Sequence, residues 1–145
     1  MTTSLIVGLD GTPGGDSAIA YAKRVASLVG AETRIILCYV VEWSPYSFNT
    51  PEENAQRASR RENEIKLARE RVLAPAISEL EKEGYQVEGR VRHGDAAEIL
   101  SLLAREVNAE QIIVGRKGES VRSRIFGSVT AHLIQEASVP VTIVP

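Results

Sequence analysis

Short apolar runs alternate along this chain with longer segments in which apolar residues recur every three or four positions. Two of the runs, Leu5–Leu9 and Arg34–Val41, are almost entirely apolar, which is typical of parallel strands covered on both faces. Shorter runs predict further strands at Gln86–Val91, Ile112–Val114 and Val141–Val144. The pattern therefore predicts five strands separated by helical segments.

The first helix is predicted between the first two strands. It follows a turn-rich loop at Asp10–Gly15, and its apolar residues within Ala18–Val29 lie at spacings that place them on one helical face. Asp16 or Ser17 is expected to cap its N-terminus, and Gly30 is expected to end it in the left-handed conformation.

The second helical segment, Glu52–Glu83, carries many charges of both signs, which favours a solvated outer face. Pro75 lies inside this segment. It should kink or divide the helix, because proline has no N–H to donate and its ring clashes with the preceding turn. The inward stripe of the segment is predicted to consist of Ile65, Ala68, Val72, Ala76 and Leu80.

Two further helices are predicted in the second half of the chain. Asp95 and Glu98 have the spacing of a capping box at the start of one helix. The inward face of that helix should hold Ile99, Leu100, Leu103 and Val107. The other helix, Gly127–Ala137, should direct Val129, Leu133, Ile134 and Ala137 inward.

Regular alternation of strands and helices predicts an α/β fold, in which an open parallel five-stranded sheet lies between two layers of helices. Right-handed crossovers permit few strand orders, of which 3-2-1-4-5 is the one we predict. A chain of 145 residues fits a single domain, residues 1–145. The first and fourth strands would then be neighbours, and a ligand is expected in the crevice beyond their carboxyl ends.

Composition narrows the functional classes. A net charge of -2 argues against a general nucleic-acid-binding protein. A single cysteine, Cys38, excludes an intrachain disulfide and a cysteine-based zinc cluster, and its apolar surroundings favour a buried thiol. With no basic leader and no apolar stretch of about 20 residues, the chain is expected to be cytoplasmic and not inserted in a membrane.

Two loops should meet in the crevice. One contains Asp10, and the other, after the fourth strand, contains three glycines followed by Ser128. Glycines permit close backbone approach to phosphate oxygens, and a helix N-terminus adds unpaired N–H donors. Four cations surround these glycines: Arg116, Lys117, Arg122 and Arg124.

His93 and His132 have no carboxylate at ligand spacing and no nucleophile partner, so neither a metal site nor a catalytic triad is expected.

Taken together, these residues resemble the universal stress protein family. The pattern Gly115-x-x-Gly118, then a spacer, then Gly127-Ser128 looks like the ATP-binding motif of that family. The segments Ile6–Thr12, Gly94–Ile99 and Ser138–Val144 are also similar to it, so the resemblance covers essentially the whole chain. The spacer Glu119–Phe126 has eight residues, one fewer than is usual in the family.

The resemblance implies a flavodoxin-like or Rossmann-like fold, ATP as ligand, and homodimers paired through the fifth strand: Val141, Thr142, Ile143 and Val144. Asp10 would contact the ribose or a phosphate-bound metal, and the backbone of Val40 or Val41 would hold adenine. The implied nucleotide site consists of Gly8, Leu9, Asp10, Thr12, Val40, Val41, Gly115, Arg116, Gly118, Arg124, Gly127, Ser128 and Val129.

Three functions remain open at the level of sequence. The first is a regulatory homodimer for the stress response that binds ATP and responds to it. The second is a slow ATPase or nucleotidyl transferase in which Asp10 holds Mg²⁺ or Mn²⁺ and Arg116 or Arg124 stabilises phosphate charge, although no general base is evident. The third is a dimeric scaffold that binds no nucleotide.

Overall fold

Five parallel strands form one sheet in the computed structural model, which describes residues 2–11, 13–30, 32–42, 50–116 and 129–145. The strands are β1 (Thr3–Leu9), β2 (Thr33–Glu42), β3 (Gln86–Gly94), β4 (Gln111–Gly115) and β5 (Val141–Val144). Their order is β3-β2-β1-β4-β5, and every neighbouring pair is parallel. The predicted sheet and strand order are confirmed.

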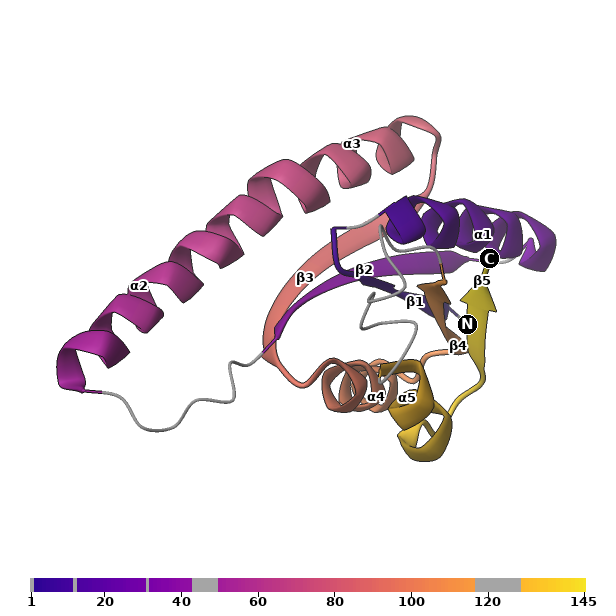
Figure 1. Cartoon of the computed structure of the whole chain (residues 1–145). Coiled ribbons are helices and arrows are strands. Elements are labelled where there is room, and N and C mark those ends of the chain that lie inside the picture. Colours follow the sequence, from indigo (N-terminus) through magenta and orange to yellow (C-terminus); the bar gives the residue numbers. More distant parts are fainter. Residues whose placement is uncertain (1, 12, 31, 43–49, 117–128) are drawn as a thin grey trace.

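Helices cover both faces of this sheet (Figure 1). One face carries α1 (Pro13–Val29) and a long helical segment made of α2 (Pro51–Leu67), the π-helical turn η1 (Ala68–Leu73) and α3 (Ala74–Lys82). The other face carries α4 (Ala96–Glu106) and α5 (Thr130–Glu136). The predicted three-layer α/β/α architecture is therefore confirmed.

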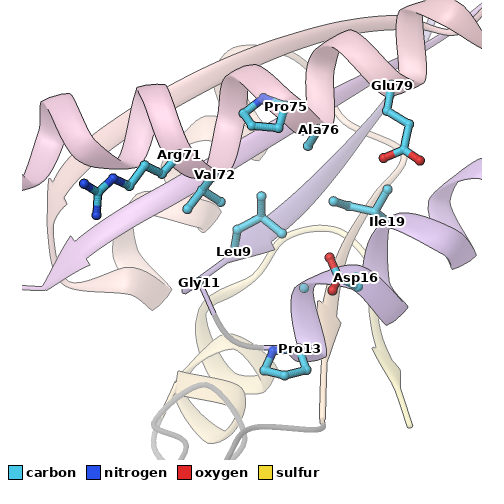
Figure 2. A pocket seen from close by; sticks show the side chains of 11 residues that line it. Leu9, Gly11, Pro13, Asp16, Ile19, Arg71, Val72, Pro75, Ala76 and Glu79 are labelled. Atoms are coloured by element: carbon cyan, nitrogen blue, oxygen red, sulfur yellow. The ribbon is translucent and has the colours of Figure 1, made fainter.

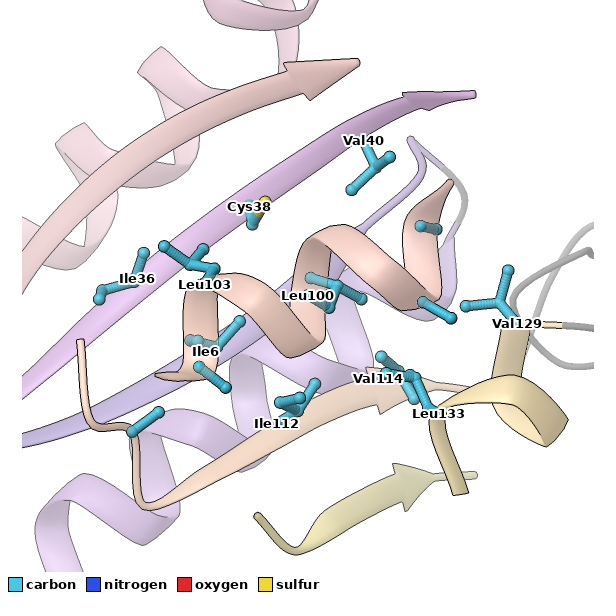
Figure 3. Close-up of a cluster of buried hydrophobic side chains, with 14 residues drawn as sticks. Ile6, Ile36, Cys38, Val40, Leu100, Leu103, Ile112, Val114, Val129 and Leu133 are labelled. Carbon is cyan, nitrogen blue, oxygen red and sulfur yellow. The ribbon is translucent and has the colours of Figure 1, made fainter. Parts of the chain in front are cut away.

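Each central strand supplies residues to two separate cores, because successive side chains point to opposite faces. In β1, Leu5 and Val7 pack under α1 and the long helical segment, whereas Ile6 packs against α4. Figure 3 shows this second core, in which Leu100 and Leu103 of α4 lie over the sheet. Burial on both faces explains why these strands are continuous apolar runs.

Helix α1 begins earlier than predicted. Pro13 is its first residue, so the Gly14-Gly15 pair lies in the first turn and is buried, and Asp16 and Ser17 lie inside the helix instead of capping it. Proline suits a first helical position, since its fixed φ is already helical and its missing N–H would be unpaired there. The glycines had indicated a loop, but their lack of side chains lets the helix start closely against the sheet.

Pro75 divides the long helical segment, as predicted. The N–H of Ala74 donates to the carbonyl of Arg69, five residues back, in the π-helical turn that precedes the proline. The turn changes which residues point inward: Ala68 and Leu73, five apart, are 5% and 2% exposed. Val72, which the predicted stripe contained, is only partly buried.

The remaining two helices follow most of their predictions, and of the predicted capping box the Asp95 half is observed. The Asp95 carboxylate accepts the Glu98 N–H at 3.0 Å and caps α4. In α5, Val129 and Leu133 are buried, but Ile134 is 68% exposed, so its inward assignment was wrong. The buried residues of α5 include Thr130 and Leu133, which lie on one side of the helix. Ile134 follows Leu133 and points about 100° away from it around the helix axis. The expected helix start at Gly127 lies outside the described residues.

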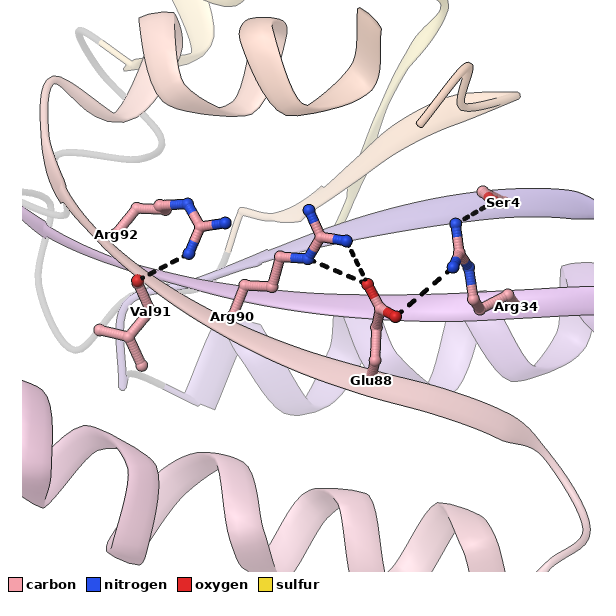
Figure 4. Close-up of polar contacts among 6 residues, drawn as sticks. All are labelled: Ser4, Arg34, Glu88, Arg90, Val91 and Arg92. Atoms are coloured by element: carbon pink, nitrogen blue, oxygen red, sulfur yellow. Dashed lines mark hydrogen bonds and ion pairs between the residues drawn. The ribbon is translucent and has the colours of Figure 1, made fainter. Parts of the chain in front are cut away.

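A polar network lies on the sheet face that carries α4, near the β3 edge (Figure 4). The Glu88 carboxylate bonds to Arg90 at 2.6 Å and to Arg34 at 3.4 Å, and Arg34 also donates to the Ser4 hydroxyl at 3.3 Å. The charged groups are only about one-third exposed and hold three neighbouring strands together.

Candidate functional site

The carboxyl ends of β1 and β4 lie side by side, where the ligand crevice was predicted. Gly8 is paired with Val114, so the next residues of the two strands, Leu9 and Gly115, end the pair together. Gly115 lies directly against α1, because a Cβ at this position would overlap the backbone of Gly14. The strand end and the helix N-terminus are thus brought into backbone contact.

A cavity of about 410 Å³ opens beside this contact, between α1 and the long helical segment (Figure 2). Leu9 forms its base, and Asp16 and Ile19 of α1 form one wall. Residues of η1 and α3 form the opposite wall: Arg71, Val72, Pro75, Ala76 and Glu79. We call this space the β1 cavity.

A second cavity of about 410 Å³ lies at the carboxyl end of β2, and we call it the β2 cavity. Its strand side consists of Tyr39, Val40 and Val41. Its helix side consists of Glu64, Leu67, Ala68, Arg71 and Val72. Arg71 and Val72 line both cavities, so the π-helical turn lies over the boundary between them.

Tyr39 also lies at that boundary. Its hydroxyl donates to the Asp10 carbonyl at 3.5 Å, and a Cβ on Gly11 would lie 3.2 Å from the hydroxyl oxygen. Gly11 has φ +82°, a conformation that glycine adopts without steric cost. Burial raises the pKa of the Tyr39 phenol, and the negative charges of Asp10 and Glu64 raise it further. The phenol therefore stays protonated and remains a hydrogen-bond donor to the Asp10 carbonyl.

Some residues of the implied nucleotide site lie along these cavities. Leu9 lines the β1 cavity, and Val40 and Val41 line the β2 cavity. Asp10 lines neither cavity, but its carbonyl accepts a hydrogen bond from Tyr39, which lines the β2 cavity. Gly115 lies at the β4 end.

Other residues of the implied site lie elsewhere. Gly8 is buried towards α4, where a Cβ would lie 3.0 Å from Leu100 and 3.1 Å from Val114. Val129 is buried in the same core. Arg116 is exposed, and its N–H donates to the Val144 carbonyl at 2.7 Å, which extends the pairing of β4 with β5. Five residues lie outside the described residues: Thr12, Gly118, Arg124, Gly127 and Ser128.

Among the cavity residues that sequence reasoning did not assign to the site are Tyr39 and Arg71. Tyr39 belongs to a run that simply predicts a buried strand, although its hydroxyl close to the strand end was an available signal. Arg71 is one of many charged residues in the helical segment, and nothing in the sequence marks the π-helical turn that directs it to the cavities.

Cys38 and His93 are titratable groups outside the two cavities. Burial raises the pKa of the Cys38 thiol to about 11, with a small opposing effect of Arg92 and Arg90, so the predicted buried thiol is inert at neutral pH. Burial lowers the pKa of His93, and Arg61 lowers it further against the opposing charge of Glu64.

The residues that the structure describes contain no group of three or more histidine, cysteine or carboxylate side chains arranged to hold a metal ion. None of the helices formed by these described residues is both long enough and apolar enough to cross a membrane.

The chain is similar to proteins of one known family over its whole length. The model of the universal stress protein family matches residues 1–145. A universal stress protein of Mycolicibacterium smegmatis is 30% identical over 149 residues, which cover 97% of this chain and 47% of that protein. The chain thus spans about half the length of the curated relatives it matches.

Solved structures share the fold. The universal stress protein UspA from Lactobacillus plantarum superimposes with a TM-score of 0.82 at 19% identity, covering 99% of this chain and 97% of that one. A family member from Arabidopsis thaliana with bound AMP has a TM-score of 0.67 at 18% identity, covering 98% and 90%. A universal stress protein in complex with cAMP has a TM-score of 0.60 at 24% identity, covering 98% and 95%. These likenesses confirm the predicted fold class.

Proposed function

The chain belongs to the universal stress protein family, and we propose that it binds an adenine nucleotide at the carboxyl ends of β1, β2 and β4. The observation that carries this proposal is the pair of adjoining cavities, each of about 410 Å³, at the ends of β1 and β2. Open parallel sheets bind ligands in such a crevice. The structures of relatives with AMP and with cAMP support an adenine nucleotide as the ligand.

The cavities favour one orientation of the nucleotide. The β2 cavity has apolar walls formed by Val41, Leu67 and Val72, which suit a flat base. The N-terminus of α1 lies beside Gly115, and its unpaired N–H groups and partial positive charge suit phosphates. We propose that adenine occupies the β2 cavity, that Asp10 contacts the ribose or a phosphate-bound metal, and that the phosphates extend towards α1 and Gly115.

We propose ATP as the physiological ligand and a regulatory homodimer as the working form. Arg116 follows β4 and is the first of the cations that the sequence places after this strand, which favours a ligand with several phosphates. A ligand with different affinities for two states of the protein shifts the equilibrium between them, and this shift would carry the signal. Dimer formation is proposed through the outer edge of β5.

Calorimetric titration of the nucleotide-free protein with ATP and AMP tests the proposal. We expect saturable binding with a dissociation constant below the millimolar range. Val72 lines both cavities, so Val72→Trp should fill them and abolish binding, with an unchanged circular dichroism spectrum. Leu102→Trp, at an exposed position of α4 on the opposite face, is the matched control and should bind normally. Absence of binding to the unmodified protein would favour the scaffold hypothesis.

A further inference from the structure

The π-helical turn η1 directs Arg71 to the β2 cavity. Ala68 and Leu73 hold the turn to the core on both sides of this residue. In Figure 2, Arg71 and Glu79 lie at opposite ends of the β1 cavity, with Leu9 and Val72 between them. Because Arg71 also lines the β2 cavity and Glu79 does not, its guanidinium is the charged group at the end where the two cavities adjoin.

Arg71 is available to a ligand. Its side chain is exposed, and the ion pairs among the described residues join Lys23 to Glu83 and Glu88 to Arg34 and Arg90. Arg71 is also the one cation among the described residues that line either cavity. A guanidinium at the rim of an apolar pocket offers donors and a flat face for stacking on an aromatic base.

Glu64 supplies the complementary acceptor in the same cavity. It lies one helical turn before Ala68 and lines the β2 cavity together with Arg71. The β2 cavity thus contains one side chain that can only donate and one that, when ionised, can only accept. The apolar side chains of Val41, Leu67 and Val72 line the same cavity.

We infer that Arg71 and Glu64 contact the edge of the bound base and determine that adenine is accepted. Adenine presents an acceptor, N7, beside a donor, the N6 amino group, whereas a 6-oxopurine presents two acceptors there. The Arg71 guanidinium donates to the ring nitrogen and the Glu64 carboxylate accepts from the amino group. A 6-oxopurine would place its carbonyl oxygen against the carboxylate, and this repulsion rejects it. The inference rests on the proposed function, because it assigns side chains to the same site.

Titrations with AMP, ATP and IMP separate a contact with the base from other roles. Arg71→Ala should weaken AMP and ATP by the same factor, roughly tenfold, since one hydrogen bond to a charged group is lost. A contact with phosphates would instead affect ATP more than AMP. Glu64→Gln should lower the preference for AMP over IMP by about tenfold, because the amide can donate to the carbonyl oxygen. A purely structural role would leave that preference unchanged.

Controls come from the same turn of the helix. Arg69 and Glu70 are exposed and line neither cavity, so Arg69→Ala and Glu70→Gln should bind all three nucleotides like the unmodified protein. The inference is overturned if the unmodified protein binds AMP and both test variants keep its affinity and its preference over IMP. Failure of the unmodified protein to bind AMP would instead overturn the proposed function itself, so the two failures are distinguishable.

Discussion

Single residues set how closely the chain segments around the crevice approach one another. Gly115 ends β4 against the backbone of Gly14, and Gly15 leaves room for Leu9, whose side chain would lie 2.9 Å from an added Cβ. On the β2 side, Gly11 gives room to the Tyr39 hydroxyl. Glycines thus stand at the end of β4, in the first turn of α1 and in the turn after β1, where another side chain would push these segments apart.

We predict that Gly115→Ala lowers stability and weakens nucleotide binding together. The added methyl group meets the backbone of Gly14, which cannot rotate away, so α1 must shift from the end of β4. Overpacking of this kind costs about 1–3 kcal/mol in the free energy of unfolding. Urea denaturation measures this loss, and an ATP titration at a temperature where the variant is folded measures the weakened binding.

Gly89 of β3 provides the matched control. An added Cβ there would lie 2.7 Å from the terminal methyl group of Ile77, a flexible side chain that can move. Gly89→Ala should therefore cost less than Gly115→Ala, and it should leave ATP binding unchanged because Gly89 lines neither cavity. Equal losses of stability in the two variants would show that the Gly14–Gly115 contact is not the crowded one.

At the scale of elements, α2 has no buried residue, so its helical structure depends on its own sequence. The Thr50 hydroxyl accepts the Glu53 N–H at 3.1 Å and the Glu53 carboxylate accepts the Thr50 N–H at 3.2 Å, a complete capping box. Pro51 occupies the first turn, and Glu52 and Glu53 complement the helix dipole. These local interactions stabilise a helix that receives little support from the core.

We predict that Thr50→Ala destabilises the first turns of α2 without a comparable loss of global stability. Loss of the cap should cost the helix about 1 kcal/mol. Because no residue of α2 is buried, the effect should appear as local opening, measured as faster hydrogen exchange of the α2 amides. Ser59→Ala, which removes a hydroxyl from an exposed position in the middle of α2, should leave exchange unchanged. An equal increase in all helices would contradict a local role for the cap.

The elements that the sequence predicts well are those with a strong period or a local signal. All five strands, the division at Pro75 and the Asp95 cap follow from the apolar runs, the missing proline N–H and the spacing to Glu98. The start of α1 was misplaced because the glycines after Pro13 pack against the sheet, which is a tertiary effect. Ile134 was wrongly assigned to the buried face of α5 because the sequence pattern does not show how wide that face is. Its neighbour Leu133 is buried, whereas Ile134 is exposed.

Only those parts of the candidate site that follow from strand order could be located from the sequence. Strand order places the ends of β1, β2 and β4 together, so Leu9, Val41 and Gly115 could be located from the sequence. Arg71 could not, because it reaches the site through a π-helical turn whose hydrogen bonds depend on how Ala68 and Leu73 pack.

For the whole molecule, the described edges of the sheet are β3 and β5, and β5 is short and only partly buried along its length. The carbonyls of Pro140 and Val144 accept hydrogen bonds from the β4 side. Since backbone groups alternate along a strand, those of Val141 and Ile143 point to the outer edge. An edge of this kind is suited to pairing with a second copy of the chain.

We predict that Ile143→Pro abolishes the proposed dimer and leaves the monomer folded. Proline at this position removes an outward N–H, and symmetry removes it from both copies, so the dissociation constant should rise about tenfold or more. Ile143→Ala is the control, because it removes the same partly buried side chain and keeps the N–H. Light scattering after size-exclusion chromatography should show a dimer for the unmodified protein and the alanine variant, and a monomer for the proline variant. A proline variant that remains dimeric would place the interface on a surface other than the outer edge of β5.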